Sequence, residues 1–267
     1  MTKIDLHTHT SYCDGNDTPT ELVAEAYKRG FDAIGLTGHS YVEFDDCCMT
    51  LEGTKKYRQE VNALKQRYDG KMDIFLGLEQ DYYSPEYEKG YDYIIGSVHY
   101  IYKNGEYISV DIDPEDLDER IEKYFDGNFD NFVEEYFSLV SDVVNKTQCD
   151  IIGHIDLISK FIETNPRPIT NRYKSAALKC VKALIPYEKP FEINVGAMTR
   201  GYRTSPYPAE FILKEIFKLG GKIVINGDCH NKNNLGDYLD LAINHAKKCG
   251  FNERLILTPN GFKSEEI

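Results

Sequence analysis

The sequence predicts an α/β fold around a largely parallel β-sheet, of a size that fits one barrel domain spanning residues 1–267. Short apolar runs alternate with amphipathic segments along the whole chain of 267 residues. Strand–helix alternation is typical of parallel sheets, and about 250 residues is the usual length of a barrel built from such units. No stretch of linker-like composition divides the chain.

The strand candidates are short apolar runs bounded by polar or glycine-containing segments. The first seven are the clearest, and an eighth at 254–258 is weaker. The clear candidates cover residues 3–6, 33–37, 73–78, 93–98, 150–153, 191–194 and 222–226.

Amphipathic segments between these runs predict the helices. The first begins at Thr18, has Pro19 in its first turn and ends near Gly30, which is a typical capping pattern. A polar, proline-rich segment at 163–168 is expected to be an exposed loop and is a candidate lid. The other helices are expected at 54–68, 114–125, 128–146, 171–185, 208–219 and 235–249.

Charge and cysteine usage restrict the partners and the compartment. The chain carries 31 Lys and Arg against 44 Asp and Glu, a formal charge of −13. Such a surface repels nucleic acid and anionic membranes, and bound divalent cations would offset part of the excess. No apolar run approaches the ~20 residues of a membrane span, and no signal peptide precedes the first strand candidate. Seven scattered cysteines exclude a complete disulfide framework, so we expect a cytoplasmic protein with reduced thiols.

The placement of the histidines is the main functional signal. Six of seven follow predicted strands, whereas His245 falls within a predicted helix, where a solvated side chain is expected. The third strand ends instead in a carboxylate, Glu79. Because strand ends meet at one rim of a barrel, these side chains are candidate metal ligands or acid–base groups. The six are His7, His9, His39, His99, His154 and His230.

Spacing and residue type suggest how the side chains cooperate. His7 and His9 are two residues apart and so face the same side of an extended segment, as do Asp228 and His230. Glu79 is the natural bridging ligand, since one carboxylate can hold two cations ~3.5–4 Å apart. Asp5 is expected to orient an imidazole rather than to bind metal. A structural role would explain one strand-end histidine more readily than six.

Seven short motifs between residue 4 and about residue 235 together resemble the PHP (polymerase and histidinol phosphatase) superfamily. They occur in the same order along the chain as in that family. The chain length and the Gly-His-Ile-Asp-Leu motif resemble its stand-alone histidinol-phosphate phosphatases. The resemblance implies a distorted (β/α)7 TIM-like barrel with a trinuclear metal centre. The motifs are Ile4-Asp5-Leu6-His7-Thr8-His9-Thr10, Cys13-Asp14-Gly15, Gly38-His39, Gly77-Leu78-Glu79, Ser97-Val98-His99, Gly153-His154-Ile155-Asp156-Leu157 and Gly227-Asp228-Cys229-His230.

The same resemblance implies the ligands, carried over position by position. The first metal would take His7, His9, Glu79 and Asp228. The second would take Glu79, His99 and His154, and the third would take Asp14, His39 and His230. Family members vary between Asp and His at the position of Asp14. Zinc, manganese and iron all accept such ligands, so the metal stays open.

The implied activity is hydrolysis of L-histidinol phosphate, a small-molecule ester, to L-histidinol and phosphate in histidine biosynthesis. A metal-bridging hydroxide would attack the phosphorus. Glu79, Asp228, His99 and His154 would be the catalytic residues. Lys160 and Arg200 would clamp the phosphate, with Arg203 and Arg167 as weaker candidates.

Two alternatives remain at this point. One is a PHP phosphoesterase acting on nucleotides or oligonucleotide ends, and the other is a non-catalytic metal-binding module. The cationic part of histidinol phosphate needs anionic or aromatic partners at the rim. The candidates are Glu43, Asp45, Asp46, Asp81, Tyr82, Tyr83, Tyr100 and Tyr102.

Overall fold

Seven parallel strands form a nearly closed barrel in the computed structural model, which describes residues 1–85 and 89–267. The two edges of the sheet are joined beyond the strands, where the Cys229 N–H donates to His7 O (3.1 Å) and the His9 N–H donates to Cys229 O (2.8 Å). The α/β barrel prediction is confirmed. In sheet order the strands are β1 (Ile4–Asp5), β2 (Ala33–Leu36), β3 (Asp73–Asp81), β4 (Tyr93–Ser97), β7 (Ile151–Ile152), β8 (Phe191–Asn194) and β9 (Ile223–Asn226).

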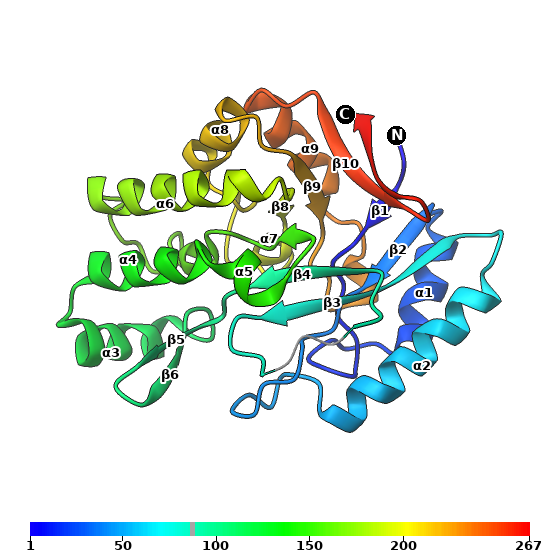
Figure 1. Ribbon diagram of the computed structural model, residues 1–267, viewed down its shortest axis with the longest axis horizontal. Helices are drawn as coiled ribbons and strands as arrows, with labels where there is room; N and C mark the ends of the chain where they lie inside the picture. The colour runs from blue at the N-terminus through cyan, green and yellow to red at the C-terminus, as the bar shows by residue number, and fades with distance from the viewer. Residues whose placement is uncertain (86–88) are drawn as a thin grey trace.

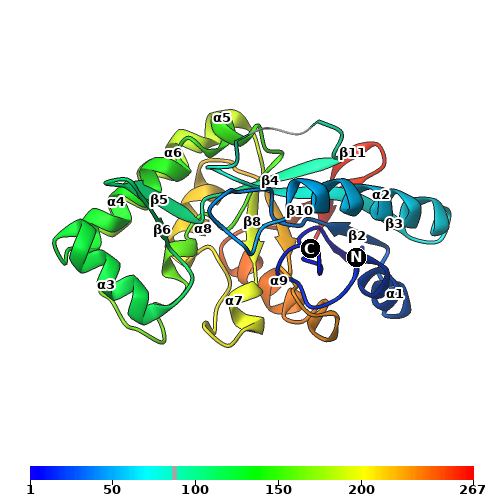
Figure 2. The ribbon, with the colours of Figure 1, turned by 90° about the horizontal axis from the view of Figure 1, so that it is seen from below.

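Helices surround the barrel (Figures 1 and 2). Figure 1 shows α3, α4 and α6 stacked on one side of the strands and α1 and α2 on the other. Their bounds are α1 (Pro19–Lys28), α2 (Leu51–Arg67), α3 (Pro114–Phe125), α4 (Phe129–Val140), α5 (Val143–Thr147), α6 (Asn171–Leu184), α7 (Gly196–Thr199), α8 (Glu210–Lys218) and α9 (Leu239–Lys248).

Helix termini follow the predicted signals closely, with two differences. Thr18 and Glu21 form a reciprocal capping box at the start of α1. The segment 128–146, expected as one helix, is divided into α4 and α5. The Ser141 hydroxyl donates to Phe137 O (2.6 Å) at the break, a contact that bends helices. The last helix starts at Leu239 rather than near 235, because Gly236 and Tyr238 have positive φ.

Two antiparallel hairpins interrupt the parallel alternation. The expected eighth strand, 254–258, is β10 (Glu253–Thr258), and it pairs with β11 (Gly261–Glu266) rather than with the barrel. A second hairpin joins β5 (Tyr100–Lys103) to β6 (Glu106–Ser109). Both turns contain Asn-Gly, at 104–105 and 260–261, the dipeptide that favours tight hairpins. The strand predicted at 254–258 is therefore present, but it belongs to a hairpin and not to the seven-stranded barrel.

Apolar side chains form two packed clusters. The larger one fills the layer between strands and helices, and includes Ile34, Val61 and Phe137. The smaller one fills the barrel and combines strand residues such as Phe75 and Val224 with Ile256 and Leu257 of β10. The hairpin thus adds apolar side chains to the barrel interior, and the polar rim is a separate feature.

None of the described helices is long and apolar enough to span a membrane. All seven cysteines are free thiols, as expected.

Candidate metal centre and active site

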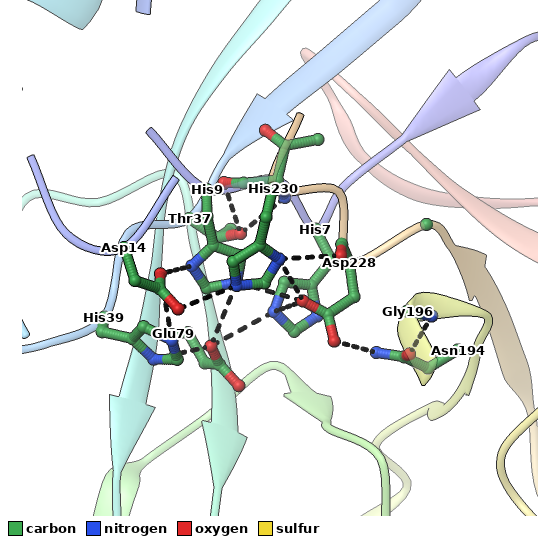
Figure 3. A network of polar contacts seen from close by, with 12 residues as sticks. His7, His9, Asp14, Thr37, His39, Glu79, Asn194, Gly196, Asp228 and His230 are labelled. Carbon is green, nitrogen blue, oxygen red and sulfur yellow. Dashed lines mark hydrogen bonds and ion pairs between the residues drawn. The ribbon is translucent and has the colours of Figure 1, made fainter. Parts of the chain in front are cut away.

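The predicted ligands come together at the carboxyl ends of the barrel strands (Figure 3). Glu79 lies within β3, and the others lie on the segments that follow β1, β2, β4, β7 and β9. The residues brought together are His7, His9, Asp14, His39, Glu79, His99, His154, Asp228 and His230. The side chains expected at the strand ends therefore do meet at one rim, and their role as metal ligands stays a prediction.

Glu79 is the centre of this arrangement, and its oxygen Oε2 faces three imidazoles. Oε2 lies 3.2 Å from His7 Nε2 and 3.4 Å from His9 Nε2. It also lies 3.0 Å from His39 Nδ1. A single carboxylate oxygen is thus surrounded by ring nitrogens from two strand ends.

The other oxygen of Glu79, Oε1, faces a separate set. It lies 2.9 Å from His154 Nε2 and 3.4 Å from His99 Nε2. It also accepts a hydrogen bond from the Ser97 hydroxyl (2.7 Å). The two oxygens of one buried carboxylate therefore point to two groups of imidazoles, the geometry that a bridging ligand needs.

Asp14 and Asp228 complete the cluster. Asp14 lies 3.0 Å from His230 Nε2 through Oδ2, and 3.6 Å from His39 Nε2 through Oδ1. Asp228 Oδ1 lies 3.2 Å from His9 Nε2. A Cβ at Gly196 would stand 2.5 Å from Asp228 Oδ2, so glycine at that position leaves room for the carboxylate.

The donor set fits divalent cations. Within the described chain, His7 Nε2, His9 Nε2 and Glu79 Oε2 are buried without a hydrogen-bond partner, although they point at one another. Unsatisfied buried polar atoms of this kind are costly unless an ion joins them. Candidate ligand atoms within 4.8 Å of one another belong to four groups: His9, Asp14, His39 and His230; His7, His9 and Glu79; His7, His154 and Asp228; and His39, Glu79 and His99.

Electrostatics in the cluster follow from burial and mutual charge. Burial alone would raise the pKa of Glu79, but His7 and His39 outweigh it and hold the pKa well below its usual value. Burial alone would lower the pKa of His39, but Glu79 and Asp14 raise it well above the ordinary value. Burial and the neighbouring His230 lower the pKa of His9 to about 3. The carboxylates are therefore ionised, and cations compete with protons for the imidazoles.

A cavity of about 290 Å³ opens above the cluster and is also lined by both predicted phosphate-binding cations. The Arg200 guanidinium donates to Asp228 Oδ2 (3.2 Å). The Lys160 ammonium is buried and donates to the carbonyl (2.6 Å) and carboxylate (2.9 Å) of Asp111. An ammonium has three N–H groups, so one remains for a ligand.

The weaker cation candidates lie elsewhere. Arg203 is buried against Ser159 and Ser205, and Arg167 pairs with Asp118. Neither lines the cavity. Their expected role at the phosphate is therefore not supported.

Only some of the acidic and tyrosine side chains that were predicted to contact the cationic part of the substrate line the cavity. Asp45 and Tyr100 line the cavity, and the Tyr100 hydroxyl donates to Asp45. Asp81, predicted to meet the substrate, also lines the cavity, but its carboxylate is largely buried and faces His99 Nδ1 (3.1 Å). The side chains of Glu43, Asp46, Tyr82, Tyr83 and Tyr102 do not line the cavity.

Sequence reasoning also missed a carboxylate behind the site. Glu192 Oε1 in β8 lies 2.7 Å from His7 Nδ1, so Glu192, and not Asp5, contacts that imidazole. Asp5 instead accepts from the backbone N–H groups of His7 (3.1 Å) and Gly227 (2.9 Å). The available signal was a charged residue between two apolar ones, Phe191 and Ile193, in a predicted strand.

A parallel barrel whose rim gathers imidazoles and carboxylates defines a class of metal-binding barrel proteins. The PHP domain matches residues 5–196, and the chain belongs to this family. It is 26% identical over 260 residues to the histidinol-phosphatase of Bacillus subtilis, covering 88% of this chain and 96% of the relative. It is also 26% identical over 280 residues to that of Lactococcus lactis, covering 100% and 97%.

A solved structure shares the fold. The histidinol phosphate phosphatase of Lactococcus lactis, solved with zinc, L-histidinol and phosphate, superposes with a TM-score of 0.75 at 23% identity. The match covers 98% of this chain and 99% of that one.

Proposed function

We propose that this protein is a metal-dependent phosphomonoesterase that hydrolyses L-histidinol phosphate to L-histidinol and phosphate. One observation carries the proposal: a single cavity is lined by side chains that could bind metal ions and by two cationic side chains, Lys160 and Arg200. The names of the curated relatives, which match nearly the whole chain, support the choice of ester.

The proposed centre holds three divalent ions, with zinc, manganese or iron as candidates. His7, His9, Glu79 and Asp228 would hold the first, and Glu79, His99 and His154 the second. Asp14, His39 and His230 would hold the third. When bound, the cations supply an activated water as nucleophile and neutralise charge on the phosphoryl oxygens.

The remaining roles belong to the protein's own side chains. Arg200 can bind two phosphate oxygens through its guanidinium fork, and Lys160, in the segment after β7, can add a point charge. Asp45 lines the same cavity and favours a leaving group that carries positive charge, whereas the charge of Asp111 is paired with Lys160. Histidinol, with its ammonium group, has that charge, whereas a nucleotide does not.

Substrate preference tests this assignment. We expect kcat/KM for L-histidinol phosphate to exceed that for adenosine monophosphate at least about tenfold, roughly 1.4 kcal/mol of discrimination. The reason is that a nucleotide would bring no positive charge to Asp45. Phosphate release is measured for both esters with the same metal-loaded preparation. Equal or faster turnover of the nucleotide would favour the alternative phosphoesterase activity, and no turnover of either would favour a metal-binding module.

Arg200→Ala tests the phosphate clamp. A charged hydrogen bond is worth roughly 1.5–3 kcal/mol, so we expect KM for the ester and the inhibition constant of inorganic phosphate to rise together, about ten- to a hundredfold. Metal content should not change. Arg172→Ala, which removes a half-exposed guanidinium paired with Glu134 on the outer helices, serves as the matched control. Undiminished phosphate inhibition of the Arg200→Ala protein would show that Arg200 does not bind phosphate.

A further inference from the structure

The most informative buried group outside the cavity is the Glu192 carboxylate. Its side chain is fully buried and does not line the cavity, so it cannot touch a substrate there. Its oxygens nevertheless contact residues on four strand ends: His7 after β1, His154 after β7, Asn194 in β8 and Asn226 in β9.

Two backbone groups determine how the amides around Glu192 are oriented. The Leu6 N–H donates to Asn226 Oδ1 (3.1 Å), so the amide nitrogen of Asn226 must face Glu192 Oε1 (2.8 Å). The Gly196 N–H donates to Asn194 Oδ1 (2.8 Å), so the Asn194 nitrogen faces Glu192 Oε2 (3.1 Å). Figure 3 shows that Asn194 also reaches Asp228.

Of the four groups that contact Glu192, only the His7 ring can either carry or lack a proton at the contacting atom. Glu192 Oε2 already receives the His154 backbone N–H (2.9 Å) and Asn194, and Oε1 receives Asn226. Three donors that cannot be reversed already point at Glu192, an arrangement that favours a carboxylate which accepts a fourth hydrogen bond from His7 Nδ1, 2.7 Å from Oε1. A ring protonated on Nδ1 can present the lone pair of Nε2, the buried atom that points to Glu79.

We infer that Glu192 is a positioning residue that keeps the proton of His7 on Nδ1 and so makes Nε2 available as a metal ligand. It acts through His7 and contacts no reacting atom. The same carboxylate holds the backbone of His154, so it links side chains proposed to bind two different ions. This inference rests on the proposed metal site.

Glu192→Gln tests the inference with little change of volume. A glutamine has one oxygen and one NH2 group, and the oxygen is needed where two fixed donors, His154 N–H and Asn194, converge. The NH2 group would then face His7 Nδ1 and move the ring proton to Nε2. Loss of such an orienting contact typically costs 10–100-fold in metal affinity. We expect zinc affinity at one site to fall by that factor in a chelator competition titration.

Asp5→Asn is the matched control. It also converts a buried carboxylate to an amide beside His7, but Asp5 contacts the backbone of His7 and not its ring. Zinc affinity should stay at the wild-type value. If Glu192 merely stabilises the fold, Glu192→Gln would lower the unfolding temperature and leave zinc affinity unchanged, which would overturn the inference.

Nuclear magnetic resonance of zinc-loaded wild-type protein labelled with ¹⁵N-histidine gives a test that needs no Glu192 variant to fold. We expect a proton on Nδ1 of His7 and none on Nε2. A proton on Nε2 would overturn the role of Glu192. Failure of wild-type protein to bind zinc at all would instead contradict the proposed metal site, so the two failures are distinguishable.

Discussion

Glu79→Ala should reduce kcat/KM for the phosphate ester by at least about a thousandfold, because several kcal/mol of transition-state stabilisation depend on the ions it would bridge. Its two oxygens face five imidazoles, so its loss affects the proposed first and second ions together. Steady-state assays across a range of added zinc and manganese measure the effect. Near wild-type turnover by this variant would contradict a bridging role.

The stability of Glu79→Ala separates a site defect from a folding defect. The carboxylate lies at the rim, outside both apolar clusters, and its Oε2 is buried without a hydrogen bond among the described residues. Metal-free variant and metal-free wild type should therefore unfold within a few degrees of each other. Glu134→Ala, on the outer surface of α4, is the matched glutamate control and should retain full activity.

Removal of metal by a strong chelator should abolish phosphatase activity without unfolding the protein. The barrel interior and the layer beneath the helices are packed by apolar side chains that need no ion. Circular dichroism should show unchanged secondary structure. The unfolding temperature should fall, since a ligand at 1,000 times its Kd adds about 4 kcal/mol to stability.

Return of zinc or manganese should restore the activity of the same sample. A chelated protein that keeps its activity while elemental analysis finds it metal-free would contradict the proposed chemistry. Loss of secondary structure on chelation would mean that the ions are needed for folding. That result would contradict the expectation that the apolar clusters are stable without them.

Local patterns sufficed to predict the barrel and the residues at its rim. Alternation of strands and helices, together with the rule that parallel strands end at one rim, predicts that His9, His39 and His230 meet there, and their rings lie beside one another. The ligand sets came from the family resemblance rather than from spacing. They agree with the observed proximity of Asp14, His39 and His230.

Contacts between distant residues could not be predicted in this way. Glu192 and His7 are 185 positions apart, and Lys160 meets Asp111 across 49 positions. A single sequence carries no record of which strands' side chains meet behind a rim. The two Asn-Gly hairpins are different, because their signal is local and was present.

Anomalous X-ray scattering from crystals of the zinc-loaded protein, recorded at the zinc absorption edge, tests the central claim most directly. The proposed centre predicts one peak on each side of the Glu79 carboxylate and a third beside Asp14 and His230. Zinc peaks at other places, with none near Glu79, would contradict it.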